Sequence, residues 1–167
     1  MTPIEIERKF LIEMPEKSVL KKYASRTKDI IQTYLTPVSN ETARVRMITD
    51  GETVSYVKTV KRRISDLSHF EDEHEISYEE YRAELKNRDV SKKDIEKTRY
   101  CIDFSGHILE IDVYPFWTDR AVLEIELSSE DETFDIPDYI KVIKEVTEDG
   151  RYKNTNLAKE IQMDIIG

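Results

Sequence analysis

The sequence predicts an α+β fold in which an antiparallel β-sheet closes into a barrel, with charged side chains on its inner wall and helices outside. Two observations lead to this prediction. Strand-like segments recur along the whole chain, and six of them carry charges of one sign at positions i and i+2, which share a face of a strand. A solvated sheet face usually mixes the two signs, because like charges side by side repel. We therefore expect the charged faces to point inward, toward one another.

The length and composition suit one folded, highly charged domain. The chain has 167 residues, enough for one full core, and we expect residues 1–167 to form a single domain. Charged residues make up 37% of the chain and the net charge is −9, which argues against nonspecific binding to nucleic acid or to an anionic membrane. The N-terminus is charged and no long apolar run follows, so we expect a soluble cytoplasmic protein. Cys101 alone allows neither an internal disulfide nor a thiolate zinc site.

The first half of the chain reads as strands joined by turn signals. A strand is expected at residues 3–13, where alternation places Glu5, Glu7 and Lys9 on one face. Pro15 and the segment KSVLKKYA predict a short helix. The later elements expected here are a strand at 28–36 and two strands at 42–49 and 53–62, joined by a hairpin at Asp50-Gly51.

The second half continues with strands and ends in segments that we expect to be helical. Strands are expected at 68–76, 96–104, 107–114 and 121–129, and a helix at 78–88. Ser105-Gly106 offers a turn between the strands at 96–104 and 107–114. Residues 138–146, after Pro137, have helical composition. The last stretch, 154–166, repeats apolar residues every four positions, at Leu157, Ile161 and Ile165.

The predicted inner wall carries more acids than bases. Such a wall is stable only if it is wet and if a ligand and metal ions complete the charge pairing. Carboxylate oxygens favour Mg²⁺ or Mn²⁺ over zinc, and arginines match phosphate oxygens bidentately, so the wall suits a substrate with several adjacent phosphates. The six bases are Lys9, Arg44, Arg46, Lys61, Lys97 and Arg99, and the nine acids are Glu5, Glu7, Glu71, Glu73, Glu75, Glu110, Asp112, Glu124 and Glu126.

The charged motifs also occur in a recognisable order. They are EIERKFL (5–11), RVR (44–46), TVK (59–61), ExExE (71–75), KTRY (97–100), ExD (110–112), ExE (124–126) and EVT…YKN..LA (145–158). This ordered set resembles the CYTH family, the triphosphate tunnel metalloenzymes, over nearly the whole chain, and the opening resembles that of its bacterial members.

The resemblance implies an eight-stranded antiparallel tunnel that binds triphosphate compounds together with a divalent metal. Members hydrolyse inorganic triphosphate, thiamine triphosphate, nucleoside triphosphates or RNA 5′-triphosphate ends, and some are class IV adenylyl cyclases. By this resemblance the metal ligands are Glu5, Glu7, Glu124 and Glu126. The phosphate-binding residues are Lys9, Arg44, Arg46, Lys61, Lys97 and Arg99, and Lys153 of the YKN segment is a further candidate.

The sequence departs from the family pattern at three places. His69 stands where members often have an arginine, which weakens one phosphate contact or makes it pH-dependent. Arg62 follows Lys61 where glycine is frequent. Tyr114-Pro115-Phe116-Trp117 replaces a glycine-containing turn, which affects the mouth of the tunnel and hence the choice of substrate.

The function expected from these residues is metal-dependent hydrolysis of inorganic tripolyphosphate, by in-line attack of water on a terminal phosphorus. A second metal near Glu71, Glu73 or Asp112 would orient the water. The general base is a tunnel glutamate or a lysine, with Glu71, Glu73 and Lys61 as candidates. Two alternatives stay open: a class IV adenylyl cyclase, and a non-catalytic module that binds polyphosphate or nucleotides. A homodimer is possible if the helices do not cover the apolar exterior.

Overall fold

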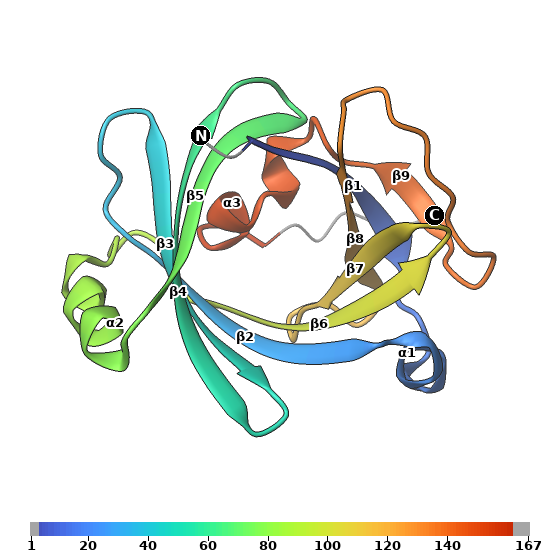
Figure 1. Ribbon diagram of the computed structural model, residues 1–167, viewed down its shortest axis with the longest axis horizontal. Coiled ribbons are helices and arrows are strands. Elements are labelled where there is room, and N and C mark those ends of the chain that lie inside the picture. The colour runs from blue at the N-terminus through green and yellow to red at the C-terminus, as the bar shows by residue number, and fades with distance from the viewer. Residues whose placement is uncertain (1–3, 162–167) are drawn as a thin grey trace.

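Eight antiparallel strands form a closed ring in the computed structural model, which describes residues 4–161 (Figure 1). The strand order is β5-β4-β3-β2-β6-β7-β8-β1, and β5 pairs with β1 to close the ring. The closed antiparallel barrel predicted from the sequence is therefore confirmed. The strands are β1 (Ile4–Glu13), β2 (Arg26–Tyr34), β3 (Glu41–Asp50), β4 (Thr53–Arg63), β5 (Ser68–Ile76), β6 (Ile95–Phe104), β7 (His107–Val113), β8 (Arg120–Leu127) and an additional β9 (Val142–Glu145).

Two tight turns set the register of the hairpins. Gly51, between β3 and β4, has a φ of +63°. Ser105 and Gly106, between β6 and β7, have φ values of +50° and +81°. Positive φ at the first central residue, or at both as in Ser105-Gly106, matches the right-handed twist of the flanking strands, which is why Gly and small polar residues occur in these turns. The two hairpins predicted from the turn dipeptides are both present.

β9 corrects the helix predicted over 138–146. β1 pairs with β5 only over Ile4–Ile6, so the same edge of β1 would be unpaired beyond that point. β9 fills the edge at Phe10–Ile12, and the Val146 backbone N–H donates to the Lys9 carbonyl at 2.8 Å. The composition of 138–146 is compatible with a helix, but an open strand edge satisfies its backbone groups better in this place.

The helices are short and lie mainly outside the ring (Figure 1). α2 (Tyr78–Glu84) begins with a capping box between Ser77 and Glu80 and continues as the 3₁₀ turn η1 (Leu85–Asn87). α1 (Lys17–Tyr23) follows β1. Near the C-terminus, the turn η2 (Gly150–Tyr152) leads into α3 (Asn154–Leu157). The helix predicted over 154–166 is thus four residues long within the described part, and Ile165 lies outside the described residues. None of the helices in residues 4–161 is long and apolar enough to cross a membrane.

The apolar faces of β1, β6, β7 and β8 pack outside the ring, as expected. Leu20 of α1 and Ile140 cover this face, so the outer core lies between the sheet and the segments that follow β1 and β8. Burying this face is the main apolar contribution to stability. Its strand residues with less than 2% exposure are Ile12, Ile102, Leu109, Ile111, Ala121, Leu123 and Ile125.

A second apolar cluster closes one end of the barrel from within, which the sequence did not predict. Leu11 and Val122 share strand parity with the inner-wall acids and therefore point inward, and Tyr34 lies opposite Arg44. Along β1 the inward residues change from Glu5 and Glu7 to Lys9 and then to Leu11. We call this cluster the apolar plug; its members are Leu11, Tyr34, Ile95, Tyr114, Trp117, Val122, Val146, Tyr152, Leu157 and Ala158.

Candidate active site

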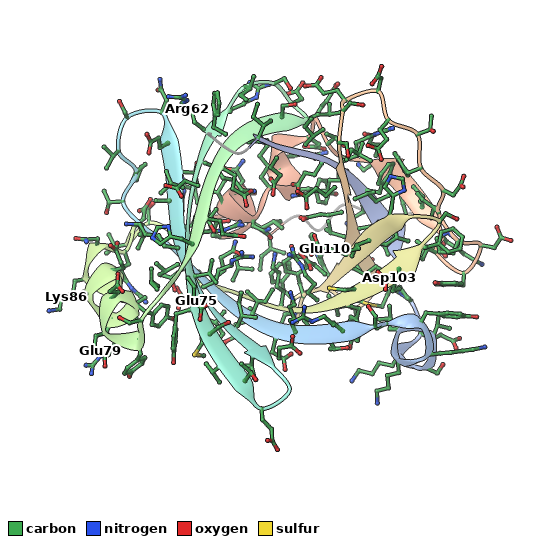
Figure 2. All side chains as sticks on the ribbon, in the orientation of Figure 1. Arg62, Glu75, Glu79, Lys86, Asp103 and Glu110 are labelled. Atoms are coloured by element: carbon green, nitrogen blue, oxygen red, sulfur yellow. The ribbon has the colours of Figure 1, made fainter. Side chains whose placement is uncertain are left out.

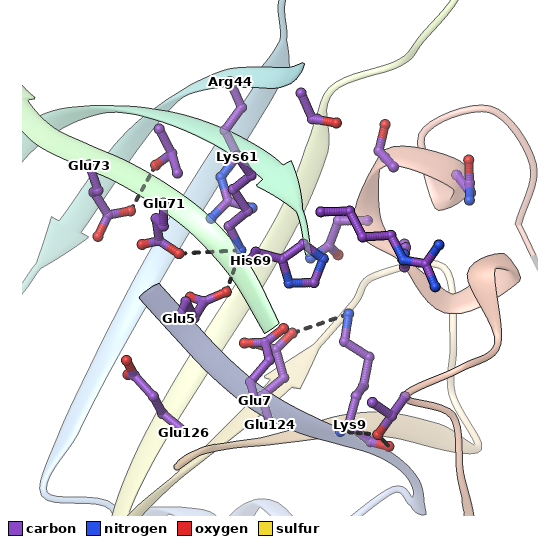
Figure 3. Close-up of a pocket in the computed structure, with 18 of the residues that line it drawn as sticks. Glu5, Glu7, Lys9, Arg44, Lys61, His69, Glu71, Glu73, Glu124 and Glu126 are labelled. Atoms are coloured by element: carbon purple, nitrogen blue, oxygen red, sulfur yellow. Dashed lines mark hydrogen bonds and ion pairs between the residues drawn. The ribbon is translucent and has the colours of Figure 1, made fainter. Parts of the chain in front are cut away.

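A cavity of about 530 Å³ occupies the barrel interior next to the apolar plug (Figure 3). Its lining is dominated by charged side chains from seven of the eight barrel strands. By contrast, Arg62, Glu79 and Lys86 lie on the outer surface (Figure 2). The lining residues are Glu5, Glu7, Lys9, Tyr34, Asn40, Thr42, Arg44, Arg46, Thr59, Lys61, Arg63, Asp66, His69, Glu71, Glu73, Lys97, Arg99, Glu110, Glu124, Glu126, Val146, Thr147, Lys153, Asn154, Thr155 and Asn156.

Strand register brings the predicted charges face to face. Glu7 lies opposite Glu126, and Lys9 lies opposite Glu124. Lys61 lies opposite Glu71 in the β4–β5 pair, and β5 is the other neighbour of β1. Because side chains at i and i+2 share a face, inward-facing pairs follow one another at every second position along two paired strands. The wall predicted from the sequence is therefore largely assembled. Among its predicted residues within 4–161, Asp112 and Glu75 do not line the cavity. Glu75 was predicted wrongly as a wall acid, because it lies near the end of β5 and is exposed there.

Asp112 lies behind the cavity wall. Its carboxylate accepts from Lys97 Nζ at 2.9 Å and from Arg99 Nε at 2.7 Å, and it has no exposed surface. Burial opposes its ionisation, but Arg99 and Lys97 together hold its pKa well below the usual range. Burial also lowers the pKa of Lys97 to about 8. Asp112 therefore holds Lys97 and Arg99, two phosphate-binding candidates, in place, and both of its oxygens already accept hydrogen bonds from them.

Two further acids are matched to bases. Arg46 donates to Glu73 at 2.6 Å, and Thr59 donates to the same oxygen at 2.7 Å. Glu124 lies 3.4 Å from Lys9 Nζ and 3.5 Å from Arg99. Burial opposes the charge on Glu124, but these cations hold its pKa at about 2. Both carboxylates are therefore ionised and compensated.

Lys61 bridges two acids from different strands. Its Nζ lies 2.8 Å from Glu5 Oε1 and 3.5 Å from Glu71 Oε2 (Figure 3). Burial and Arg44 act against its charge, but Glu7, Glu5 and Glu71 raise its pKa overall. The side chain is therefore an ammonium at neutral pH.

Glu7 and Glu126 make no ion pair with any residue in 4–161. Burial and the nearby Glu124 raise the pKa of Glu7 to about 7, and burial with Glu5 raises the pKa of Glu126. Glu5 behaves similarly, because burial and its neighbour Glu71 raise its pKa to about 7 despite Lys61. An excess of carboxylate at one place indicates a site that a cation would stabilise.

Two bases of the cavity also lack an ion pair: Arg44 and Lys153 have no carboxylate partner in the described residues. The Arg44 Nε is buried and makes no hydrogen bond there. Burial lowers the pKa of Lys153, and Arg63 and Lys9 lower it further. These cations could bind an anion that residues 4–161 do not provide.

His69 lies beside this basic group, opposite Glu5 in the β1–β5 pairing. Burial lowers its pKa to about 4, and the charges of Lys61 and Lys153 contribute. The ring is therefore neutral across the physiological range. The weakened or pH-dependent phosphate contact of His69 stays a prediction.

Several cavity residues were not singled out from the sequence. Arg63 and Thr59 share strand parity with Lys61, so extending the i, i+2 pattern in both directions would have found them. Thr147 donates to the Lys9 carbonyl and accepts from the Lys9 backbone N–H at 2.9 Å. Asn154 accepts from the Tyr114 hydroxyl at 2.5 Å. Thr147 and Asn154 belong to the EVT and YKN segments of the motif at 145–158, but their place in the cavity depends on how the C-terminal segment folds back onto the barrel.

The donor set suits a hard divalent cation, although no three carboxylates in residues 4–161 are already grouped tightly enough to enclose one. Glu5, Glu7 and Glu126 supply only oxygen donors, the ligand type of Mg²⁺ and Mn²⁺. Two of these three have no cation partner in residues 4–161, and the third is held by a lysine. The residues present therefore fit a metal of this class.

No family model matches the chain. Over 158 residues, which are 93% of this chain and 93% of the relative, the sequence is 35% identical to the inorganic triphosphatase of Acetivibrio thermocellus. The relationship therefore extends over nearly the full length of both proteins.

Solved structures share the architecture. The inorganic triphosphatase NE1496 is 28% identical with a TM-score of 0.54, over 100% of this chain and 99% of that chain. HpAC1 from Hippeastrum, named as an adenylyl cyclase and described by a dominant triphosphatase activity, shares the fold at 16% identity and a TM-score of 0.53, over 74% and 80% of the two chains. Together with the inward charges of the closed barrel, the full-length similarity shows that the chain belongs to the CYTH family, the triphosphate tunnel metalloenzymes.

Proposed function

We propose that this protein is a metal-dependent triphosphatase whose substrate is inorganic tripolyphosphate. One observation carries the proposal: a single cavity contains both Arg44, whose Nε is buried and which has no acidic partner in residues 4–161, and the carboxylates of Glu7 and Glu126, which make no ion pair there. Such a cavity accepts an anion and a cation together. The named activity of the relative from Acetivibrio thermocellus supports the same substrate.

The proposed metal ligands are Glu5, Glu7 and Glu126, and the proposed metal is Mg²⁺ or Mn²⁺. When bound, the cation would offset the charge of the phosphate oxygens and so favour attack on phosphorus. Glu124, held by Lys9, lies next to this set and supports it. Asp112 is not included, because both of its oxygens already accept from Lys97 and Arg99.

The proposed phosphate site uses the basic side chains of the wall. Arg44 needs no rearrangement, since it makes no ion pair in the described part of the chain. Lys97 and Arg99 are held in place by Asp112, so little conformational freedom is lost when they bind phosphate. The full set is Lys9, Arg44, Arg46, Lys61, Lys97, Arg99 and Lys153.

The contacts favour Glu71 as the group that orients and deprotonates water. Glu73 already accepts from Arg46 and Thr59, and despite its burial these contacts lower its pKa, which makes it a weak base. Lys61 is protonated, because its acidic neighbours raise its pKa. Glu71 Oε2 is buried and accepts no hydrogen bond within residues 4–161; its contact with the Lys61 ammonium, at 3.5 Å, is longer than the contacts that hold Glu73.

The cavity lining favours hydrolysis over cyclisation of a nucleotide. Tyr34 is the one phenol, indole or phenyl ring among the described lining residues, and it belongs to the apolar plug at the closed end. A purine base would have little aromatic surface to stack on. A triphosphate without a nucleoside has no base and therefore needs no aromatic surface for stacking.

Phosphate release from tripolyphosphate, thiamine triphosphate and ATP, each with Mg²⁺, Mn²⁺ or Co²⁺, tests the proposal. The expected result is release of one phosphate from tripolyphosphate that requires metal and exceeds release from the other two. Cyclic AMP with pyrophosphate from ATP would identify the adenylyl cyclase alternative. Tight binding of tripolyphosphate without turnover under any of the metals would identify a binding module.

A further inference from the structure

Lys61 connects the two halves of the proposed site. Its ammonium lies 2.8 Å from Glu5, a proposed metal ligand on β1, and 3.5 Å from Glu71 on β5. β1 and β5 are the two strands whose short pairing closes the barrel. In the close-up, Lys61 reaches toward both carboxylates with Arg44 beside it (Figure 3). The lysine therefore occupies a place where a metal cation is also expected.

Two cations cannot share one carboxylate oxygen in a partly buried site without strong repulsion. An ammonium 2.8 Å from Glu5 Oε1 blocks that oxygen from a divalent ion, because the positive charges would be only a few ångströms apart. Lys61 also appears among the residues expected to bind phosphate. Its present partners are both acids, so it is not yet available for a phosphate oxygen.

From this geometry we propose that Lys61 is an exchangeable internal cation. In the metal-free protein its ammonium neutralises Glu5 and Glu71. Binding of a divalent cation at Glu5 displaces the ammonium, which then turns to the phosphate oxygens of the substrate. The inference rests on the proposed function, and it adds a role for Lys61 that charge alone would not give: coupling metal binding to substrate binding.

The same strand offers a matched control. Lys58 also lies on β4 and also makes an ion pair with a glutamate, Glu84 Oε1 at 3.0 Å. Its side chain is 26% exposed and that of Lys61 is 21% exposed, so the two lysines are similar in burial. Lys58 has the opposite parity and contacts α2 on the outer side of the barrel. Changing it removes one lysine from β4 without affecting the cavity.

The first test measures Mn²⁺ binding to the protein without substrate, by electron paramagnetic resonance of free Mn²⁺ at fixed pH and salt. Lys61→Gln removes the competing ammonium, so Mn²⁺ is expected to bind about three- to tenfold more tightly than to the wild type. Lys61→Arg keeps a competing cation and Lys58→Gln leaves the cavity unchanged. Both are expected to stay close to the wild-type affinity.

The second test uses the wild-type protein, so it does not depend on the folding of a variant. The ¹⁵Nζ signal of Lys61, assigned by its loss in Lys61→Arg, is followed while Mg²⁺ is added. The expected result is a shift that saturates together with metal binding, while the Lys58 signal does not move. Tripolyphosphate added after Mg²⁺ is expected to shift the Lys61 signal again.

Two results would overturn the inference. If Lys61→Gln binds Mn²⁺ no more tightly than Lys58→Gln, or if Mg²⁺ saturates the protein without moving the Lys61 signal, the ammonium does not compete with the metal. The proposed function would survive either result as long as the wild type still releases phosphate from tripolyphosphate. A wild-type protein that binds no Mn²⁺ would overturn both.

Discussion

Lys97 Nζ lies 2.9 Å from Asp112 Oδ2, and the two side chains are only 1% and 0% exposed. Arg99 donates to the same carboxylate through two nitrogens, at 2.7 and 2.9 Å. A fully buried ion pair of this kind is maintained by its geometry, because each charge would be strongly unfavourable alone. Asp112 thus orients Lys97 and Arg99, which line the cavity, although Asp112 itself does not line it.

Asp112→Asn is expected to destabilise the protein by about 3 kcal/mol, because Lys97 and Arg99 would lose the charge that compensates them. The free energy of unfolding in urea measures the effect. Asp103→Asn on the same sheet is the control, since Asp103 is an exposed residue on β6. Equal stability of the two variants would show that the buried pair contributes little.

Glu126→Gln and Glu7→Gln are each expected to lower metal-dependent turnover by about 100-fold, because a neutral amide neither balances nor binds a divalent cation as a carboxylate does. Phosphate release at saturating tripolyphosphate, followed over a range of Mg²⁺ concentrations, measures this. Glu75→Gln, at an exposed position of β5, should behave like the wild type. Near-normal release by both cavity variants would refute the metal assignment.

Arg44→Gln is expected to reduce kcat/KM by about 100-fold, since a charge-assisted bidentate contact to phosphate is lost. Arg44→Lys should recover only part of this loss, because an ammonium is a point donor and not a planar fork. Steady-state kinetics on tripolyphosphate separate the two variants. Arg62→Gln serves as control: Arg62 is exposed and its guanidinium lies over the Phe70 ring outside the cavity. Full recovery in the lysine variant would argue against a bidentate contact.

Mn²⁺ affinity is expected to rise with pH through about pH 7. Burial raises the pKa of Glu5 and of Glu7 to about 7, so protons compete with the metal below that value. Titrations of Mn²⁺ at several pH values measure this, and Glu7→Gln should flatten the dependence. An affinity that does not change between about pH 6 and pH 8 would contradict the assignment of these two carboxylates.

The same shifts determine how the stability of the metal-free protein depends on pH. Both carboxylates have a folded-state pKa above the unfolded value of 4.5, so between these values the folded state binds more protons than the unfolded state. Their contribution to stability is therefore present at low pH and is lost as pH rises toward about 7. Urea unfolding in EDTA at about pH 5.5 and pH 8 should show this loss, and Mg²⁺ should restore stability mainly at the higher pH.

Local patterns were sufficient for most of the barrel. Alternation placed Glu5, Glu7 and Lys9 on one face, and the turn dipeptides Asp50-Gly51 and Ser105-Gly106 marked two hairpins. The same reasoning failed for 138–146. That segment becomes β9 because β5 covers the edge of β1 only over Ile4–Ile6 and leaves the rest of that edge open, which depends on the pairing of distant strands.

The sequence by itself determined which side chains face inward, because strand periodicity is a property of neighbouring residues. Only the tertiary structure decided which acids meet which bases. Lys61 and Glu5 are 56 positions apart, and closure of the barrel brings them together. Closure also places Asp112 behind the wall and Leu11 in the apolar plug, although both follow the inward alternation. Charge pairing and burial depend on the register of distant strands, and that register is set by the packing of the whole ring.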